Sequence, residues 1–313
     1  MAKCGRPEFG DWRRRASRKR RPSRGAELLI LHLLGIGKSE LLRDLREPFP
    51  EEKRQAWETM LARRAAGEPA QYVTGEQYFY GRRFAVTPAV LIPRPETELL
   101  AEAVLEGAAR IVAARRARQS EERTEAAEND GARERPSDAE LRVLDVGTGS
   151  GALAVTLKLE RPGWQVTASD LSPEALEVAA GNAAALGARV RFAQGDLLAP
   201  FMEGGAHAGE RIDILVSNPP YIPSSDLPGL QAEVRDHEPR LALDGGPDGL
   251  APYRRMALQL SGLAELPAMV AWEVGIHQAE QAAALLREVA DWDEIRIVRD
   301  YGGIDRHVLA LRF

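Results

Sequence analysis

The stretch Asp145-Val146-Gly147-Thr148-Gly149-Ser150-Gly151 joins two apolar segments of the chain. Residues 141–144 before it have the length and composition of a buried strand, whereas residues 152–157 after it have those of a helix. Glycines at such a junction let the backbone approach a ligand at the carboxyl edge of the strand. The stretch therefore predicts the nucleotide-binding turn of an α/β fold, and nicotinamide-binding folds carry a closely related turn.

Strand and helix patterns alternate after this turn at the spacing of a doubly wound sheet. We expect seven strands, at residues 141–144, 165–170, 189–194, 212–217, 269–274, 295–298 and 307–311. The last two flank the tight turn Tyr301-Gly302-Gly303, which predicts an antiparallel hairpin at one edge of an otherwise parallel sheet. The expected fold class is α/β, with a Rossmann-like sheet of seven strands.

Acidic residues follow the second and third expected strands. Asp170 ends the second strand, where a carboxylate can bind both hydroxyls of a ribose. After the third strand, Asp196 could accept a hydrogen bond from an adenine amino group, and Leu197 could pack on the ring. Each acid taken singly is also compatible with a solvated carboxylate or a helix N-cap. With the residues that follow the fourth strand, they favour S-adenosylmethionine over NAD as the ligand.

The fourth strand is followed by Asn218-Pro219-Pro220-Tyr221, which are the candidate catalytic residues. A planar amide or amine nitrogen is a poor nucleophile, so a methyl-transfer site must orient it. The Asn218 side-chain oxygen and the Pro219 carbonyl can accept its two N–H groups, and Tyr221 offers a flat face for packing. Prolines suit this role because they have no N–H and a fixed φ. Taken alone, the tetrapeptide is equally compatible with a simple turn.

Several further stretches make the chain similar to the release-factor glutamine methyltransferases (the PrmC/HemK family). They lie between about Ala26 and Phe313 and comprise residues 63–69, 75–79, 91–98, 216–222 and 238–243. The stretch Ile92-Pro93-Arg94-Pro95-Glu96-Thr97-Glu98 is more specific than Asn-Pro-Pro-Tyr, which also occurs in nucleic-acid amino-methyltransferases. The resemblance implies methylation of the glutamine amide in the Gly-Gly-Gln loop of peptide chain release factors, with S-adenosylmethionine as the cofactor.

The resemblance also assigns site residues. It implies cofactor contacts for Gly147, Thr148, Gly149, Ser150, Gly151, Asp170, Leu197 and Asn218, to which the strand pattern adds Asp196. It implies that Asn218, Pro219, Pro220 and Tyr221 hold the substrate glutamine, and Arg94 and Glu96 are predicted to join them as substrate-binding residues. The chain departs from the family in a charged insertion before the first strand and at residues 261–267, which lack the usual Gly-Gly turn.

The chain divides by composition into four parts. Residues 1–26 predict a basic, disordered tail, and residues 27–70 predict a helical domain that recognises the substrate. The aromatic and β-branched residues of 71–95 predict a β-hairpin linker. Residues 96–313 form the expected methyltransferase domain, with a charged insertion at 115–140 that is expected to be disordered or frayed.

Charge is distributed unevenly along the 313 residues. The tail, residues 1–26, carries a net charge of +8, which leaves −13 on the rest of a chain whose total is −5. An acidic body repels phosphate backbones, so we expect no nucleic-acid partner beyond a weak RNA contact of the tail. An arginine-rich leader is also compatible with organelle targeting.

The cysteine and histidine counts indicate the cellular compartment and bear on metal binding. One cysteine, Cys4, indicates a reducing compartment, and we expect a cytoplasmic protein. The five histidines lack ligand spacing, so no metal site is predicted. No stretch is long enough to span a membrane, and a monomer is the default expectation.

Two other functions stay open from the sequence. A DNA or RNA amino-methyltransferase would use the same tetrapeptide on a flipped base and would need a basic recognition surface. A non-catalytic adenosine-binding adaptor would use the tetrapeptide only as a turn.

Overall fold

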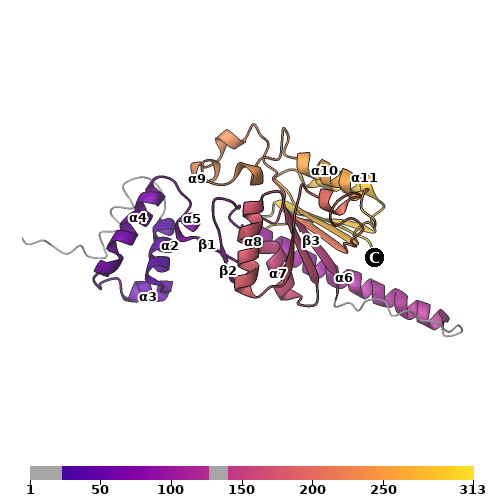
Figure 1. Ribbon diagram of the computed structural model, residues 1–313, viewed down its shortest axis with the longest axis horizontal. Helices are drawn as coiled ribbons and strands as arrows, with labels where there is room; N and C mark the ends of the chain where they lie inside the picture. The colour runs from indigo at the N-terminus through magenta and orange to yellow at the C-terminus, as the bar shows by residue number, and fades with distance from the viewer. Residues whose placement is uncertain (1–22, 127–139) are drawn as a thin grey trace, which may run out of the picture. The chain divides into compact units, whose positions relative to one another are not determined.

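The computed structural model describes residues 23–126 and 140–313, and the chain folds into two compact units (Figure 1). One unit, here called the helical unit, contains the chain up to Glu76 together with Gln231–His237. The other, here called the sheet unit, contains Gln77–Leu230 and Glu238–Phe313. The predicted tail lies almost wholly outside the described residues.

The helical unit packs short helices around a small apolar core. Its helices are α2 (Ser23–Leu34), α3 (Lys38–Arg43), α4 (Arg54–Ala65), α5 (Ala70–Thr74) and α9 (Ala232–Arg235). Leu29, Ile30, Leu41 and Trp57 are buried at its centre. The segment Gln231–His237 joins this unit through an ion pair of 2.6 Å between Arg64 and Glu233. The helical unit is therefore completed by a segment, containing α9, that lies more than 150 residues further along the chain than its other helices.

The sheet unit contains the predicted seven-stranded sheet. Its strands are β3 (Arg142–Val146), β4 (Gln165–Asp170), β5 (Val190–Gln194), β6 (Ile214–Ser217), β7 (Met269–Glu273), β8 (Glu294–Arg299) and β9 (Asp305–Leu311). They lie in the order β5-β4-β3-β6-β7-β9-β8, and β9 is antiparallel to both of its neighbours. The α/β fold class and the antiparallel hairpin at one edge are both confirmed.

Helices cover both faces of this sheet (Figure 1). The helices α6 (Pro95–Ala126), α7 (Ala152–Glu160) and α8 (Pro173–Leu186) share one buried cluster with alternate strand residues such as Val143 and Val216. The helices α10 (Ala251–Leu260) and α11 (Ala279–Val289) share a second cluster with the intervening residues Leu144 and Leu215. Successive strand residues point to opposite faces, so a sheet buried on both sides needs apolar residues at consecutive positions.

The predicted hairpin is shorter than residues 71–95, and all of it except its first residue, Glu76, belongs to the sheet unit. It consists of β1 (Glu76–Phe79) and β2 (Arg82–Ala85), while residues 70–74 form α5. Asn182 of α8 ties β2 down, because its side chain accepts a hydrogen bond from Ala85 N (2.7 Å) and donates to Ala85 O (2.9 Å). Phe79 and Phe84 are buried in the core beside α6, with their rings edge to face.

The charged segment 115–140 differs from its prediction. Residues 115–126 continue helix α6 instead of lacking regular structure, and residues 127–139 lie outside the described part of the chain. Arg115, at the start of the segment, pairs with the buried Asp213 at 3.0 Å. Composition alone missed this helix because arginine, glutamate and alanine are good helix formers even where no apolar face is present.

Candidate active site

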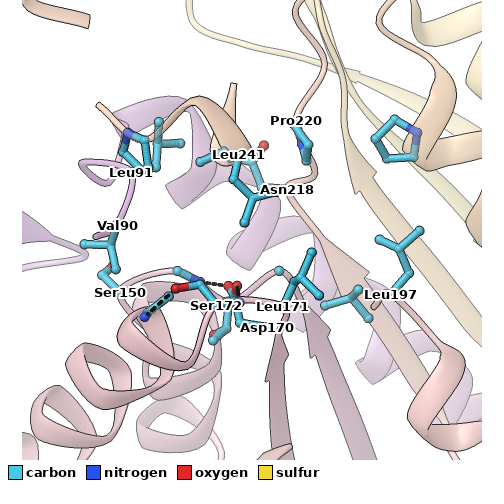
Figure 2. A pocket seen from close by; sticks show the side chains of 18 of the residues that line it. Val90, Leu91, Ser150, Asp170, Leu171, Ser172, Leu197, Asn218, Pro220 and Leu241 are labelled. Atoms are coloured by element: carbon cyan, nitrogen blue, oxygen red, sulfur yellow. Dashed lines mark hydrogen bonds between the residues drawn. The ribbon is translucent and has the colours of Figure 1, made fainter. Parts of the chain in front are cut away.

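A cavity of about 880 Å³ opens at the carboxyl edge of β3, β4 and β6. Figure 2 shows Ser150, Asp170 and Ser172 on one side of it and Leu91, Leu241 and Asn218 on the other. The structure brings most of the predicted residues together here, namely Gly147, Thr148, Gly149, Ser150, Asp170, Asp196, Leu197, Asn218, Pro220 and Arg94. Four others do not line the cavity: Gly151, Pro219, Tyr221 and Glu96.

The backbone of the glycine turn donates hydrogen bonds to a carbonyl oxygen of β4. Gly147 N and Thr148 N both donate to Ser169 O, at 2.8 and 2.9 Å. Gly149 lines the cavity with φ of 55°, and a Cβ added there would meet no atom within 4 Å. Gly151 has φ of 79°, and a Cβ there would lie 3.1 Å from Ala179 Cβ in α8. Gly149 thus leaves space for a ligand, whereas Gly151 allows helix α8 to approach.

Asp145, next to last in β3, is a buried acid that lines the cavity. Thr148 Oγ1 donates to its Oδ2 at 2.6 Å, and Ala154 N donates to the same atom at 3.2 Å. Its other oxygen, Oδ1, has no hydrogen-bond partner among the described residues. Burial raises the pKa of Asp145 to about 7, against those two hydrogen bonds, which lower it. The prediction from sequence gave Asp145 no role, although an acid near the end of an apolar strand is itself a signal.

Asp170 is fixed in the cavity by backbone amides. Its Oδ2 accepts from Gly149 N and its Oδ1 from Ser172 N, each at 2.9 Å. Burial raises its pKa, while these hydrogen bonds lower it. Each carboxylate oxygen can accept a second hydrogen bond, so Asp170 keeps acceptor capacity for ligand hydroxyls.

Asp196 and Leu197 both line the cavity, and Figure 2 shows Leu197 on the side away from Val90 and Ser150. The Asp196 carboxylate forms an ion pair with Arg255 of α10 and is partly exposed. It is therefore already engaged by a cation, which the sequence pattern did not indicate. Leu197 has φ of 52°, a left-handed backbone that is unusual for leucine. The strain is consistent with a side chain that is held in place for contact with a ligand.

Asn218 follows β6 directly and reaches the cavity from the other side (Figure 2). Ser217 Oγ donates to Val146 O at 2.7 Å, which ties the end of β6 to the glycine turn. The Asn218 side-chain Nδ2 donates to Thr97 Oγ1 at 3.1 Å, and Thr97 Oγ1 donates to Glu273 Oε2 at 2.7 Å. Neither Thr97 nor Glu273 was assigned a role from sequence, because only the fold brings them to Asn218.

Tyr221 and Pro219 pack into the protein instead of lining the cavity. The Tyr221 ring lies under the guanidinium of Arg306, whose Cζ is 5.7 Å from the ring centroid. Burial raises the pKa of Tyr221 to about 12. A Cβ at Gly249 would lie 2.2 Å from Tyr221 O, and one at Gly245 would lie 2.8 Å from Tyr221 Cα. Tyr221 therefore anchors the tetrapeptide, because its backbone packs closely against Gly245 and Gly249.

Arg94 and Glu96, the two predicted substrate-binding residues outside the tetrapeptide, differ in placement. Arg94 lines the cavity, and its guanidinium pairs with Glu238, which is nearly fully buried and also accepts from Ile92 N at 3.3 Å. That pair holds the 90–94 wall of the cavity against the segment that begins at Glu238. Glu96 is half-buried and does not belong to the cavity lining.

Two kinds of structure are absent from the described residues. Within residues 23–126 and 140–313, no three His, Cys, Asp or Glu side chains are grouped so that they could hold a metal ion. In the same ranges, no helix combines the length and apolar character needed to cross a membrane.

A Rossmann-like seven-stranded sheet defines a methyltransferase when a glycine turn and the Asn218 and Pro220 of an Asn-Pro-Pro-Tyr segment line one cavity, as they do here. Family models agree: residues 12–75 match the PrmC N-terminal domain, and residues 133–230 match the methyltransferase small domain. The first match begins at residue 12, so the resemblance extends further toward the N-terminus than the predicted start at Ala26.

Curated relatives identify the family. The chain is 39% identical over 290 residues to the release factor glutamine methyltransferase of Bacillus cereus, covering 93% of each chain. It is 42% identical over 295 residues to that of Moorella thermoacetica, covering 93% of this chain and 92% of the relative. The chain belongs to the release factor glutamine methyltransferase family. The catalytic domain of hMettl16 in complex with an RNA hairpin shares the fold alone, with a TM-score of 0.50 and 11% identity over 82% of this chain and 92% of that one.

Proposed function

We propose that the protein transfers a methyl group from S-adenosylmethionine to the side-chain amide nitrogen of the glutamine in the Gly-Gly-Gln loop of peptide chain release factors. The observation that carries the proposal is the position of Asn218, on the cavity formed by the glycine turn and with its side-chain NH₂ group bound to Thr97. Relatives of this name, aligned over nine-tenths of the chain, support the choice of substrate.

The cavity suits S-adenosylmethionine. Gly147 and Gly149 present bare backbone to it, Asp170 keeps acceptor capacity for ribose hydroxyls, and Leu197 offers an apolar face for a base. The unpartnered Oδ1 of Asp145 adds a buried acceptor to its lining. When bound, this cofactor supplies an electrophilic methyl group on a positively charged sulfur. Because Asp196 is paired with Arg255, we assign it mainly to holding the cavity wall in place, and only secondarily to accepting a hydrogen bond from the adenine.

The residues of the chain act on the acceptor amide by orientation. Asn218 Oδ1 is the acceptor for one of its two N–H groups, which directs the nitrogen lone pair toward the methyl carbon. Pro219, the other acceptor expected from the sequence, does not line the cavity, so we assign the second N–H group to no acceptor. Holding reacting atoms about 3–3.5 Å apart and aligned accounts for much of the rate gain in such a reaction. The nitrogen carries an extra proton after transfer and passes it to water or a carbonyl, so no side-chain base is needed.

The acidic body of the chain favours a protein over a nucleic-acid acceptor. Apart from residues 1–26, the chain carries a net charge of −13, which repels a phosphate backbone. We assign recognition of the release factor to the helical unit, and we infer that the enzyme acts as a monomer in the cytoplasm, where a single cysteine stays reduced.

Donor labelled in the methyl group tests the proposal directly. The enzyme is offered, in separate reactions, release factor, the same factor with Gln→Ala in its Gly-Gly-Gln loop, DNA and RNA. We expect label on the unaltered factor alone. Label on nucleic acid without label on the factor would select the alternative amino-methyltransferase, and binding of donor without transfer to any acceptor would select the adaptor.

A further inference from the structure

Residues from three elements form one chain of hydrogen bonds that ends at the Asn218 side chain. Thr97 lies in the first turn of α6, Glu273 ends β7, and Asn218 follows β6, which pairs in parallel with β7. Thr97 and Glu273 are both buried, at 6% and 1% exposure. The bonds run from Asn218 Nδ2 to Thr97 Oγ1 (3.1 Å) and from Thr97 Oγ1 to Glu273 Oε2 (2.7 Å).

The direction of these bonds determines which end of the Asn218 amide meets the cavity. A threonine hydroxyl has one hydrogen, and an ionised carboxylate can only accept. The Thr97 hydrogen is therefore committed to Glu273, and Thr97 can only accept from Asn218. Only the NH₂ end of the Asn218 amide can donate, so its carbonyl oxygen is left for the cavity.

We propose that Thr97 and Glu273 are positioning residues that present the oxygen of Asn218, and not its NH₂ group, to the methyl-accepting amide. The inference rests on the proposed function, since it assumes that the substrate brings N–H donors to Asn218. It explains why a buried acid lies directly behind a residue that must act as an acceptor. A neutral partner that could both donate and accept would leave both amide orientations open.

Protonation of Glu273 reverses the bond direction. A neutral carboxyl can donate to Thr97, whose hydroxyl then donates to Asn218 Oδ1 and turns the NH₂ end to the cavity, where it cannot accept from the substrate. Burial raises the pKa of Glu273 to about 7, whereas the hydrogen bond from Thr97 and the charge of Arg306 lower it. Activity should therefore fall as the pH drops below about 7.

Several titratable and charged groups face Glu273. Tyr221 is one of them, and burial together with the charge of Glu273 raises its pKa to about 12. Asp145, whose pKa is also about 7, is not among the groups that shift the pKa of Glu273.

From α6, Glu96 raises the pKa of Glu273, and from β9, Arg306 lowers it. His307 Nε2 lies 4.0 Å from Glu273 Oε2, but burial lowers the pKa of His307 to about 4, so it is neutral near pH 7. From α10, Tyr253 donates its hydroxyl to Glu273 O, and burial raises its pKa well above the ordinary value.

The first test compares Thr97→Val with Thr97→Ser on release factor at saturating donor. Valine keeps the shape but removes the hydroxyl, and serine keeps it. We expect Thr97→Val to lower kcat by at least roughly tenfold, which is less than the 10²–10³-fold typical of losing a direct contact. KM should change little. Thr97→Ser should keep most of the wild-type kcat. Thr156→Val is the matched control, because Thr156 is a fully buried threonine in α7 whose hydroxyl has no partner among the described residues. Unchanged kcat in Thr97→Val would overturn the proposal.

The second test does not depend on turnover. The ¹H–¹⁵N signals of the Asn218 side-chain amide are followed with pH in the wild type and in Glu273→Gln. We expect a shift with a midpoint near pH 7 in the wild type and none in the variant, together with a severalfold lower kcat that no longer falls below pH 7. The same midpoint in both proteins would overturn the relay. A wild type that shows the midpoint but does not methylate release factor would overturn the proposed function instead.

Discussion

The two sides of the cavity are built differently. The donor side, from Asp145 to Ser172, comes from one β-α-β unit, and backbone amides hold its carboxylate, Asp170, in place. The acceptor side depends on side chains far apart in sequence: Asn218 is 121 residues from Thr97, and Thr97 is 176 residues from Glu273. We therefore expect a side-chain replacement on the donor side to act on donor binding, and a replacement in the hydrogen-bonded chain on the acceptor side to act on turnover.

Replacement on the acceptor side should have the largest effect. Asn218→Ala removes the acceptor that orients the substrate amide, and we expect kcat to fall by roughly 10²–10³. Donor affinity, measured by calorimetry, should change much less. Asn218→Asp is the matched control, because it keeps an acceptor but places a second carboxylate beside Glu273. Turnover at the wild-type rate in Asn218→Ala would remove Asn218 from the mechanism.

Replacement on the donor side should act on binding instead of turnover. Asp170→Ala removes charge-assisted hydrogen bonds worth roughly 1.5–3 kcal/mol, so the Kd for donor should rise by about one to two orders of magnitude. Because such bonds hold ground and transition states alike, kcat at saturating donor should stay near the wild-type value. Asp170→Asn keeps one acceptor and should lie between the two. A fall in kcat with unchanged donor affinity would contradict the contrast between the two sides.

Asp145, on the donor side, makes the stability of the protein depend on pH. Its pKa is raised to about 7 in the folded protein from an ordinary value of 3.8, so between these values the folded state holds a proton that the unfolded state has lost. Asp145 therefore lowers the free energy of unfolding as the pH rises from about 4 to 7. Asp145→Asn should be more stable than the wild type by about 1–3 kcal/mol at pH 8 and nearly equal to it at pH 4, measured by urea unfolding. A difference of the same size at both pH values would place its origin elsewhere.

The smallest effect is expected from deletion of N-terminal residues. Deletion of residues 1–11 should leave kcat/KM on free release factor unchanged, because this stretch precedes the family match at residue 12 and holds two basic and two acidic residues. Deletion of residues 1–22 is the comparison, since it also removes seven arginines and lysines within the matched region. A large defect from the shorter deletion would mean that the N-terminus takes part in substrate recognition.

The sequence by itself determined the parts of this protein whose physics is local. Seven strands, the glycine turn and Asn218 at a strand end follow from runs of apolar residues and from the junctions between them. The family also follows from sequence, because short stretches such as residues 92–98 keep their order along the chain. Each of these features depends on residues within about ten positions of one another.

Only the tertiary structure decided which distant side chains meet. It placed Thr97 and Glu273 behind Asn218, paired Asp196 with Arg255, turned Tyr221 away from the cavity, and assigned residues 231–237 to the helical unit. It also continued α6 to Ala126 through a charged segment. The physical reason is that a hydrogen bond or ion pair of about 3 Å depends on the packing of whole helices and strands, and no local pattern in the sequence records which side chains that packing brings together.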